Sequence, residues 1–453
     1  MACAPAYDGG TTEPGGWCMK THRWRLATAA ACALAAFAQA ASAEMFVVRA
    51  GRVLDVEQGR YVNDQAIRID DGRIVSISPW RAGSRGGAGL VDWSAYTVIP
   101  GLIDLHTHLV GDISSADVAA PLSSSAARDA LVGAAHARTT LAAGFTTVRD
   151  VGSYRALVDV ALRNAINASL VEGPRMYVAG AYVTVTDGGG EVTGLPEGVT
   201  VPDEMRRGVA DDEAAVRRRV RELLAGGADF IKLIATGAVF TSGTTPSEPE
   251  YTEAEIRAAV EEAAKGGTFV AAHAHGAEGI KNAVRAGVRT IEHASFLDDE
   301  GIELMVRHGT WLVADIYNGD YTEEVGARDG WSEEILQKNR ETADIQREGF
   351  EKAVRAGVRI GFGTDAGIFP HGENARQFAY MVRHGMTPLG AIRAATIDAA
   401  ASLGRSQELG SITPGKFADL VAIDGDPLAD IERMRHVAGV IKQGQLVAAG
   451  ASR

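Results

Sequence analysis

The chain has 453 residues, of which 46% are hydrophobic and 23% are charged, a composition typical of a globular protein. Acidic residues outnumber basic ones by 58 to 45, so the formal net charge at pH 7 is −13. This balance argues against nucleic acid as a partner, because nucleic acid binding needs a basic surface. The three cysteines are Cys3, Cys18 and Cys32. The rest of the chain therefore has neither disulfides nor thiolate metal ligands, and any metal there must be held by nitrogen and oxygen atoms.

Residues 1–43 have the pattern of a secretory signal peptide. Three basic residues precede a mostly apolar stretch at 26–38, and small residues follow it at 41–43. Met19 stands where such a peptide would naturally begin, and the apolar stretch is too short to anchor the chain in a bilayer. We therefore expect an exported protein, periplasmic or secreted, without a stable membrane anchor. Lipid attachment at Cys32 is the less favoured alternative.

Segments near both ends of the chain alternate polar and apolar residues with the period of a half-buried strand. Residues 66–77 do so around Asp71-Gly72, which predicts a tight β-hairpin, and residues 417–447 contain similar segments. We expect the two ends, 44–97 and 407–453, to meet in one small discontinuous β-sandwich domain.

The apolar run 98–105 ends in His106-Thr107-His108. Successive side chains of a strand point to opposite faces, so His106 and His108 share one face and can approach the same metal ion. By itself this pair is weak evidence, because a short polar pair is often only surface. Its meaning depends on residues further along the chain.

Six later segments follow one formula, in which a glycine ends a helix, an apolar strand follows, and a polar residue closes the strand. The glycines are Gly144, Gly227, Gly267, Gly287, Gly309 and Gly357, and the closing residues are Arg149-Asp150, Lys232, His273, His293, Asp315 and Asp365. The heptapeptide Ala-Val-Arg-Ala-Gly-Val-Arg even occurs twice, at 283–289 and 353–359. Each unit predicts a helix, a left-handed glycine cap and a buried parallel strand.

Together with the run at 98–108 and the run at 175–179, these units give eight strands that alternate with helices. The pattern predicts an α/β protein, a (β/α)8 TIM barrel over residues 98–406, with the small β-sandwich domain beside it. A doubly wound sheet is the alternative. Such a sheet typically has a glycine-rich phosphate loop after its first strand, whereas this chain has His-Thr-His there. In TIM barrels the catalytic groups sit at the carboxyl ends of the strands, where all the candidate ligands fall.

Five segments together carry a family resemblance. They are residues 98–108, 227–235, 270–276, 291–293 and 363–367. In these segments the chain resembles the imidazolonepropionase-like branch of the amidohydrolase superfamily. That branch includes prolidase-like Xaa-amino-acid dipeptidases and carboxypeptidases, and ochratoxin-hydrolysing amidohydrolases. The resemblance implies two divalent metal ions, usually zinc, bridged by a carboxylated lysine and a hydroxide, and a small-molecule amide or peptide as substrate.

Carried over residue by residue, the resemblance implies six metal ligands. They are His106, His108 and Asp365 for the more buried ion, His273 and His293 for the more exposed ion, and Lys232 as a CO₂-derived carbamate between them. The apolar neighbours of Lys232 would lower the pKa of its amine and favour the neutral form that reacts with CO₂. Asp365 is also expected to act as general base. His275 lies on the same strand face as His273, and we expect it to contact the substrate or the oxyanion.

Other residues and functions stay open at this stage. His136 and His308 are expected to be structural, His371 is a candidate for the wall of the substrate pocket, and the loop 184–202 matches nothing in the branch. One alternative function is a mononuclear deaminase or cyclic-amidine hydrolase, since His275 and Glu278 have the H-x-x-E spacing of deaminases. Another is a non-catalytic exported binding protein on the same scaffold. The sequence leaves open the native metal, the substrate and whether the chain forms a homo-oligomer.

Overall fold

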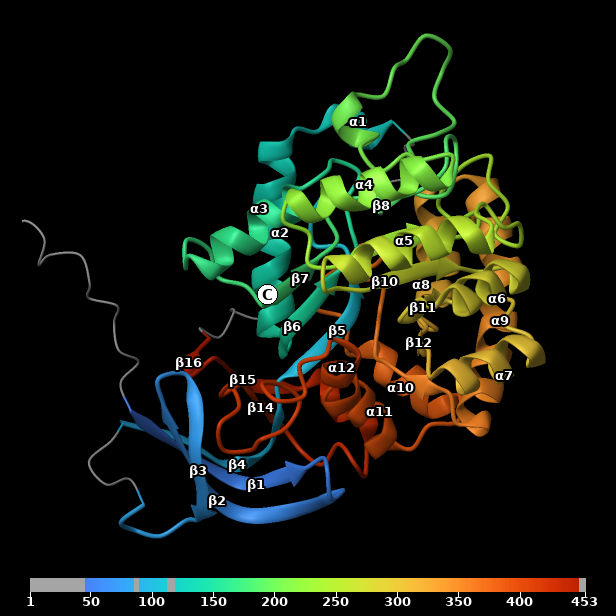
Figure 1. Ribbon diagram of the computed structural model, residues 1–453. Helices are drawn as coiled ribbons and strands as arrows, with labels where there is room; N and C mark the ends of the chain where they lie inside the picture. Colours follow the sequence, from blue (N-terminus) through green and yellow to red (C-terminus); the bar gives the residue numbers. More distant parts are fainter. Residues whose placement is uncertain (1–44, 85–88, 112–118, 448–453) are drawn as a thin grey trace, which may run out of the picture. The chain divides into compact units, whose positions relative to one another are not determined.

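The computed structural model describes residues 45–84, 89–111 and 119–447 (Figure 1). The predicted signal peptide lies outside these residues, so export stays a prediction. Within the described ranges, no helix combines the length and the apolar character needed to cross a membrane.

Strands from both ends of the chain form one mixed sheet. Its order is β16-β15-β14-β4-β1-β2-β3. The bounds are β1 (Phe46–Asp55), β2 (Arg60–Asp70), β3 (Arg73–Pro79), β4 (Gly89–Pro100), β14 (Leu420–Ile423), β15 (Val437–Lys442) and β16 (Gln445–Leu446). The predicted hairpin is confirmed, because Asp70 pairs with Arg73 across a turn whose two residues, Asp71 and Gly72, both have positive φ. These strands form a single sheet that has an apolar core cluster of its own. The β-sandwich architecture and the boundaries of the small domain stay predictions.

Parallel strands form two further sheets. One has the order β5 (Leu102–Thr107), β6 (Phe145–Asp150), β7 (Arg175–Val178). The other runs β13 (Arg359–Ile360), β12 (Trp311–Val313), β11 (Thr290–His293), β10 (Val270–Ala274), β9 (Ile231–Ile234), β8 (Tyr182–Val183). Backbone hydrogen bonds link the sheets at both edges, from Asp229 N to Val178 O (2.8 Å) and from Leu105 N to Phe362 O (2.8 Å). The α/β class is confirmed. In the described residues the paired strands form two separate parallel sheets and not one closed ring, so the barrel stays a prediction.

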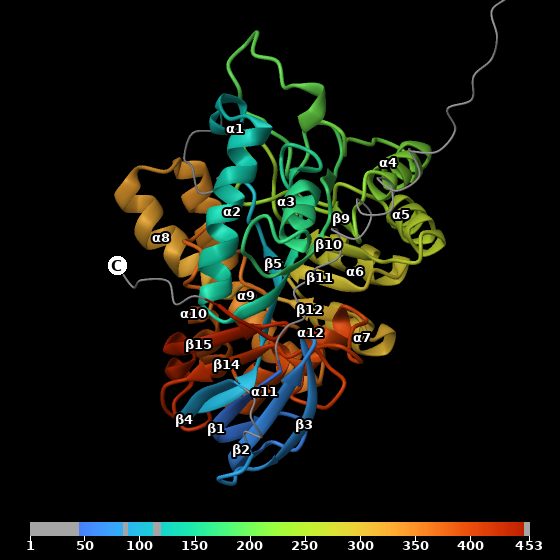
Figure 2. The same ribbon diagram turned by 90° about the vertical axis from the view of Figure 1, so that its left-hand side faces the viewer.

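Helices separate these parallel strands along the chain, as the sequence predicts, except that β8 follows β7 without a helix between them (Figure 2). They are α1 (Ala120–Ser123), α2 (Ala126–Ala142), α3 (Val158–Asn167), α4 (Glu213–Ala225), α5 (Glu253–Lys265), α6 (Ala277–Ala286), α7 (Asp299–His308), α8 (Asn318–Asp329), α9 (Glu333–Ala356), α10 (Arg376–Arg383), α11 (Pro388–Ala394) and α12 (Ile397–Ser402). Two short 3-10 helices, η1 (Asp203–Met205) and η2 (Ile431–Arg435), complete the described elements. Gly287, Gly309 and Gly357 cap α6, α7 and α9 with left-handed φ of 94°, 68° and 78°, which confirms that part of the predicted formula.

The strand registers gather the polar residues at one end. His273 lies opposite Glu292 on β11 and Ile234 on β9, and Lys232 lies opposite Ala271. Because β9, β10 and β11 are parallel, their carboxyl ends meet at the same edge, and Lys232, His273 and His293 follow there in sequence order.

Phe362 fixes the segment that leads to Asp365 beside β5. Its fully buried ring packs against Phe145 and Phe378, with centroid separations of 5.6 and 4.4 Å. We predict that Phe362→Ala lowers the free energy of unfolding by about 3–5 kcal/mol, because it leaves a cavity in the core. Chemical denaturation followed by circular dichroism measures the change.

The matched control is Leu131→Ala, at a side chain that is 73% exposed. It should change the unfolding free energy by no more than about 0.5 kcal/mol. Equal effects of the two substitutions would contradict the packing role given to Phe362.

Candidate metal centre

One cavity of about 120 Å³ lies at the carboxyl ends of the parallel strands. All seven residues predicted for the site line it: His106, His108, Lys232, His273, His275, His293 and Asp365. Asp315, the closing residue after β12, lines the same cavity. The structure therefore brings together residues that are up to 259 positions apart in the sequence, from His106 to Asp365.

Each of four histidines has one ring nitrogen held by an acceptor of the protein. The pairs are His106 Nδ1 with Glu292 Oε2 (2.8 Å), His108 Nδ1 with the Gly152 carbonyl (3.0 Å), His273 Nε2 with the Gly237 carbonyl (3.2 Å) and His293 Nδ1 with Asp315 Oδ1 (2.9 Å). A carbonyl or carboxylate oxygen can only accept, so the held nitrogen carries the hydrogen. The other nitrogen then presents a lone pair, which is the form a metal ion needs.

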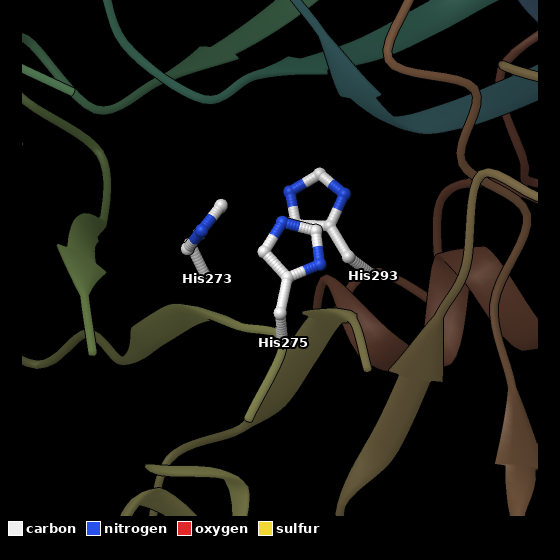
Figure 3. Close-up of side chains that lie close together, drawn as sticks. All are labelled: His273, His275 and His293. Carbon is white, nitrogen blue, oxygen red and sulfur yellow. The ribbon is translucent and has the colours of Figure 1, made fainter. Parts of the chain in front are cut away.

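The free ligand atoms form adjoining groups of the size that a metal ion requires. Asp365 Oδ1 lies 3.5 Å from His106 Nε2 and 3.2 Å from His108 Nε2. One atom each of His273, His275 and His293 lie within 4.8 Å of one another, and Figure 3 shows the three rings gathered in one place. His293 and Asp365 also belong to a shared group with Asp315, so the two sets are neighbours. This donor set of imidazole and carboxylate fits zinc-like divalent ions.

Lys232 lies in the same cavity with only 2% of its surface exposed. Burial lowers the pKa of its amine to about 8, against the opposing charge of Glu292. The direction agrees with the prediction that its apolar surroundings favour the neutral amine.

Burial also controls the charge state of the histidines. It holds the pKa of His106, His273 and His275 well below the usual value, so these rings are neutral at pH 7. For His293 burial acts in the same direction, but the charge and hydrogen bond of Asp315 outweigh it and raise the pKa. For Asp365 burial would raise the pKa, but the interactions with the neighbouring His108 and His106 side chains lower it.

Two of the predicted ligands have strained backbones. His293 and Asp365 have φ of 67° and 59°, in the left-handed region that glycine favours. Such a conformation costs about 1–3 kcal/mol and persists only where the surrounding structure imposes it. The positions therefore have the character of a functional site.

Three charged residues around these ligands have roles that the sequence did not predict. Glu292 and Arg149 are both fully buried and paired, with Arg149 Nη2 2.6 Å from Glu292 Oε1. Asp315 receives a further hydrogen bond from Gln346 Nε2 (3.0 Å). The available signal was a charged residue inside or directly after an apolar strand.

The rest of the cavity wall comes from β8 and β9, from loops, and from α8 and α9. Its apolar members include Ile234, Ala238, Val239, Phe240 and Ile368, and its uncharged polar members include Asn318, Thr322, Asn339, Thr342 and Gln346. From the predicted loop 184–202, Gly190 lines the cavity, and its backbone N–H donates to Thr241 Oγ1 (2.9 Å). Lys232 is the only lysine or arginine among the described lining residues.

Other candidates lie elsewhere. His371 lines a neighbouring cavity, where it stacks on His136 with a centroid separation of 4.3 Å. Glu278 lies in the first turn of α6 with 57% of its side chain exposed, 3.7 Å from Lys281 Nζ. The H-x-x-E spacing therefore does not bring Glu278 into the cavity with His275.

Comparisons with known proteins all indicate the same family. The profile of the Amidohydrolase family matches residues 97–447. The ochratoxinase of Aspergillus niger is 34% identical over 375 residues, which are 77% of this chain and 75% of that protein. The crystal structure of a Xaa-Pro dipeptidase with bound methionine is 36% identical with a TM-score of 0.84, and covers 89% of this chain and 99% of that one.

The imidazolonepropionase of Geobacillus kaustophilus is 27% identical over 426 residues, 85% of this chain and 90% of that protein. These relatives confirm the branch that the sequence motifs resemble. They support a hydrolase that acts on carbon–nitrogen bonds, and so favour an enzyme over the alternative of a non-catalytic binding protein. The chain belongs to the amidohydrolase family.

Proposed function

We propose that the protein is a binuclear metal-dependent hydrolase that cleaves an amide bond of a dipeptide, an N-acyl amino acid or an ochratoxin-like amide. The observation that carries the proposal is the convergence of four oriented histidines, Asp365 and a buried lysine on one cavity. The names of the similar ochratoxinase and dipeptidase support an amide as substrate.

We assign His106, His108 and Asp365 to one ion and His273 and His293 to the other. Lys232 lines the same cavity, and as a carbamate it would hold both ions. When bound, such ions would polarise the scissile carbonyl and lower the pKa of the attacking water towards about 7. The four histidines suit metal binding, because the protein already holds each ring in the tautomer that a metal ligand needs.

Asp365 moves the proton in this proposal. Its Oδ1 faces both His106 and His108, while its Oδ2 accepts a hydrogen bond from Asn318 Nδ2 (3.1 Å). Because its pKa is lowered, the carboxylate is ionised at neutral pH and ready to accept the proton of the attacking water. It would then deliver that proton to the leaving nitrogen.

We extend the proposal to the fold, in which the two parallel sheets would close as a (β/α)8 barrel. The backbone hydrogen bonds at both edges support closure, as does the single bridge between Thr107 and Ala366. The high structural similarity to the dipeptidase is consistent with it. The sheet of both chain ends would then be the small flanking domain.

The deaminase alternative is less favoured. It uses the Glu of the H-x-x-E spacing as a proton shuttle, yet Glu278 is exposed and ion-paired on the outside of α6. A proton shuttle must reach the reacting atoms directly or through one water.

We predict that the purified enzyme binds two metal ions per chain by elemental analysis and releases amine from some dipeptide or N-acyl amino acid. Lys232→Met should bind fewer ions, because methionine has similar length but cannot form a carbamate. Lys338→Met is the matched control, since Lys338 is also buried but donates to the Thr241 carbonyl (2.8 Å). Full metal content in the Lys232 variant would contradict the bridging role.

Asp365→Asn should retain most of its metal but lose about 10²–10⁴-fold in kcat, because the amide cannot accept the proton. Steady-state assays of metal-replete protein measure the loss. Asp344→Asn, at a side chain that is 91% exposed, is the control and should keep normal turnover. A near-normal kcat in the Asp365 variant would rule out the general-base role.

The wall of the cavity predicts a preference for amides with a bulky uncharged side group. Phe240→Ala should lower kcat/KM for such an amide by at least about tenfold, because apolar contact is lost. The corresponding glycine amide serves as the internal control, since it has no side group to lose contact. Equal cleavage of amides with charged and apolar side groups would show that the apolar wall does not select the substrate.

A further inference from the structure

The three histidines on one side of the cavity differ in what holds their second ring nitrogen. His273 is held by a carbonyl and His293 by a carboxylate, both of which only accept hydrogen bonds. His275 is held instead by the Ser295 hydroxyl, which lies 2.8 Å from its Nδ1 and can donate. His275 therefore differs from the two neighbouring rings, because its partner can donate a hydrogen bond.

The burial of Ser295 decides the direction of this hydrogen bond. Ser295 lines the cavity but is only 1% exposed, and within the described ranges His275 Nδ1 is the one hydrogen-bond partner of its hydroxyl. A buried O–H without an acceptor is costly, so the hydroxyl donates to Nδ1. A neutral imidazole carries a single hydrogen, which must then be on Nε2.

Hydrogen bonds hold the backbone of His275 in place, and neighbouring rings contact its imidazole. Its backbone N–H donates to Thr236 Oγ1 (3.0 Å), and its carbonyl accepts from Phe296 N (2.8 Å). The ring centroid lies 4.6 Å from that of His273 and 4.9 Å from that of His293 (Figure 3). In the described part of the chain Nε2 has no hydrogen-bond partner, and the residue lines the cavity.

We propose that His275 Nε2–H donates a hydrogen bond to the carbonyl oxygen of the substrate as negative charge develops on it. The inference rests on the proposed amide hydrolysis. No bond is broken at His275, and the hydrogen stays on Nε2 throughout. His275 is then a catalytic residue that stabilises the oxyanion, while His273 and His293, which present lone pairs, hold metal.

The competing role is a third histidine ligand, since one atom of each of the three rings lies within 4.8 Å of the others. As a ligand, His275 would have to present a lone pair on Nε2 and carry its hydrogen on Nδ1. The buried Ser295 hydroxyl would then have no acceptor among the residues that the structure describes. The two roles therefore predict opposite tautomers and opposite effects on metal content.

The first test is His275→Ala in the metal-loaded enzyme, with the exposed His308→Ala as control. We expect kcat to fall about 10²–10³-fold, KM to change little and the metal content to equal that of the wild type. Loss of one metal ion would assign His275 as a ligand. An unchanged kcat would show that His275 only packs against its neighbours. Loss of a metal ion and an unchanged kcat would each overturn the proposal.

The second test reads the tautomer without using activity. Nitrogen-15 NMR of histidine-labelled protein should show a ring with an unprotonated Nδ1 and a protonated Nε2 that disappears in His275→Ala. Ser295→Ala should mix the tautomers, keep the metal content and lower kcat by less than His275→Ala does. A protonated Nδ1 at His275 in the wild type overturns the proposal. Failure of the wild type to cleave any amide would instead overturn the proposed function and leave the tautomer result standing.

Discussion

The buried ion pair of Arg149 and Glu292 is the constraint on which the site depends. Neither side chain has any exposed surface, so each charge requires the other, because an unpaired charge in such surroundings costs several kcal/mol. Glu292 uses its second oxygen for His106 Nδ1, and Arg149 also donates to Thr290 Oγ1 (3.0 Å). One charged network thus joins β6 and β11 to the first histidine of the site and fixes the orientation of its ring.

The same principle recurs at the other ligands. Each ring is held by an acceptor from a different element, and Asp315, which follows β12, holds His293. Asn318 in α8 donates to both Asp315 and Asp365, so the carboxylates are oriented as well. A site arranged in this way needs little reordering to bind metal, and the strained backbones at His293 and Asp365 show that the scaffold imposes the arrangement.

Much of this was predictable from the sequence, because it follows from local periodicity. The repeated glycine, strand and polar residue predicted the parallel strands. Of the closing residues, Lys232, His273, His293, Asp315 and Asp365 line the cavity, whereas Arg149 and Asp150 do not. Arg149 and Glu292 were not assigned, since their pairing depends on which strands face each other across the sheets. The spacing of His275 and Glu278 was misleading, because α6 begins at Ala277 and the side chain of Glu278 in its first turn is exposed. The wall formed by α8 and α9 likewise arises from long-range packing that no short motif encodes.

The central claim is that two metal ions share one lysine-bridged site. The most direct test is anomalous X-ray scattering from crystals of the purified enzyme, recorded at the absorption edge of the metal found. The account predicts two peaks about 3.5–4 Å apart, with carbamate density on Lys232 between them. A single peak next to an unmodified Lys232 amine, in crystals of active enzyme, would contradict it.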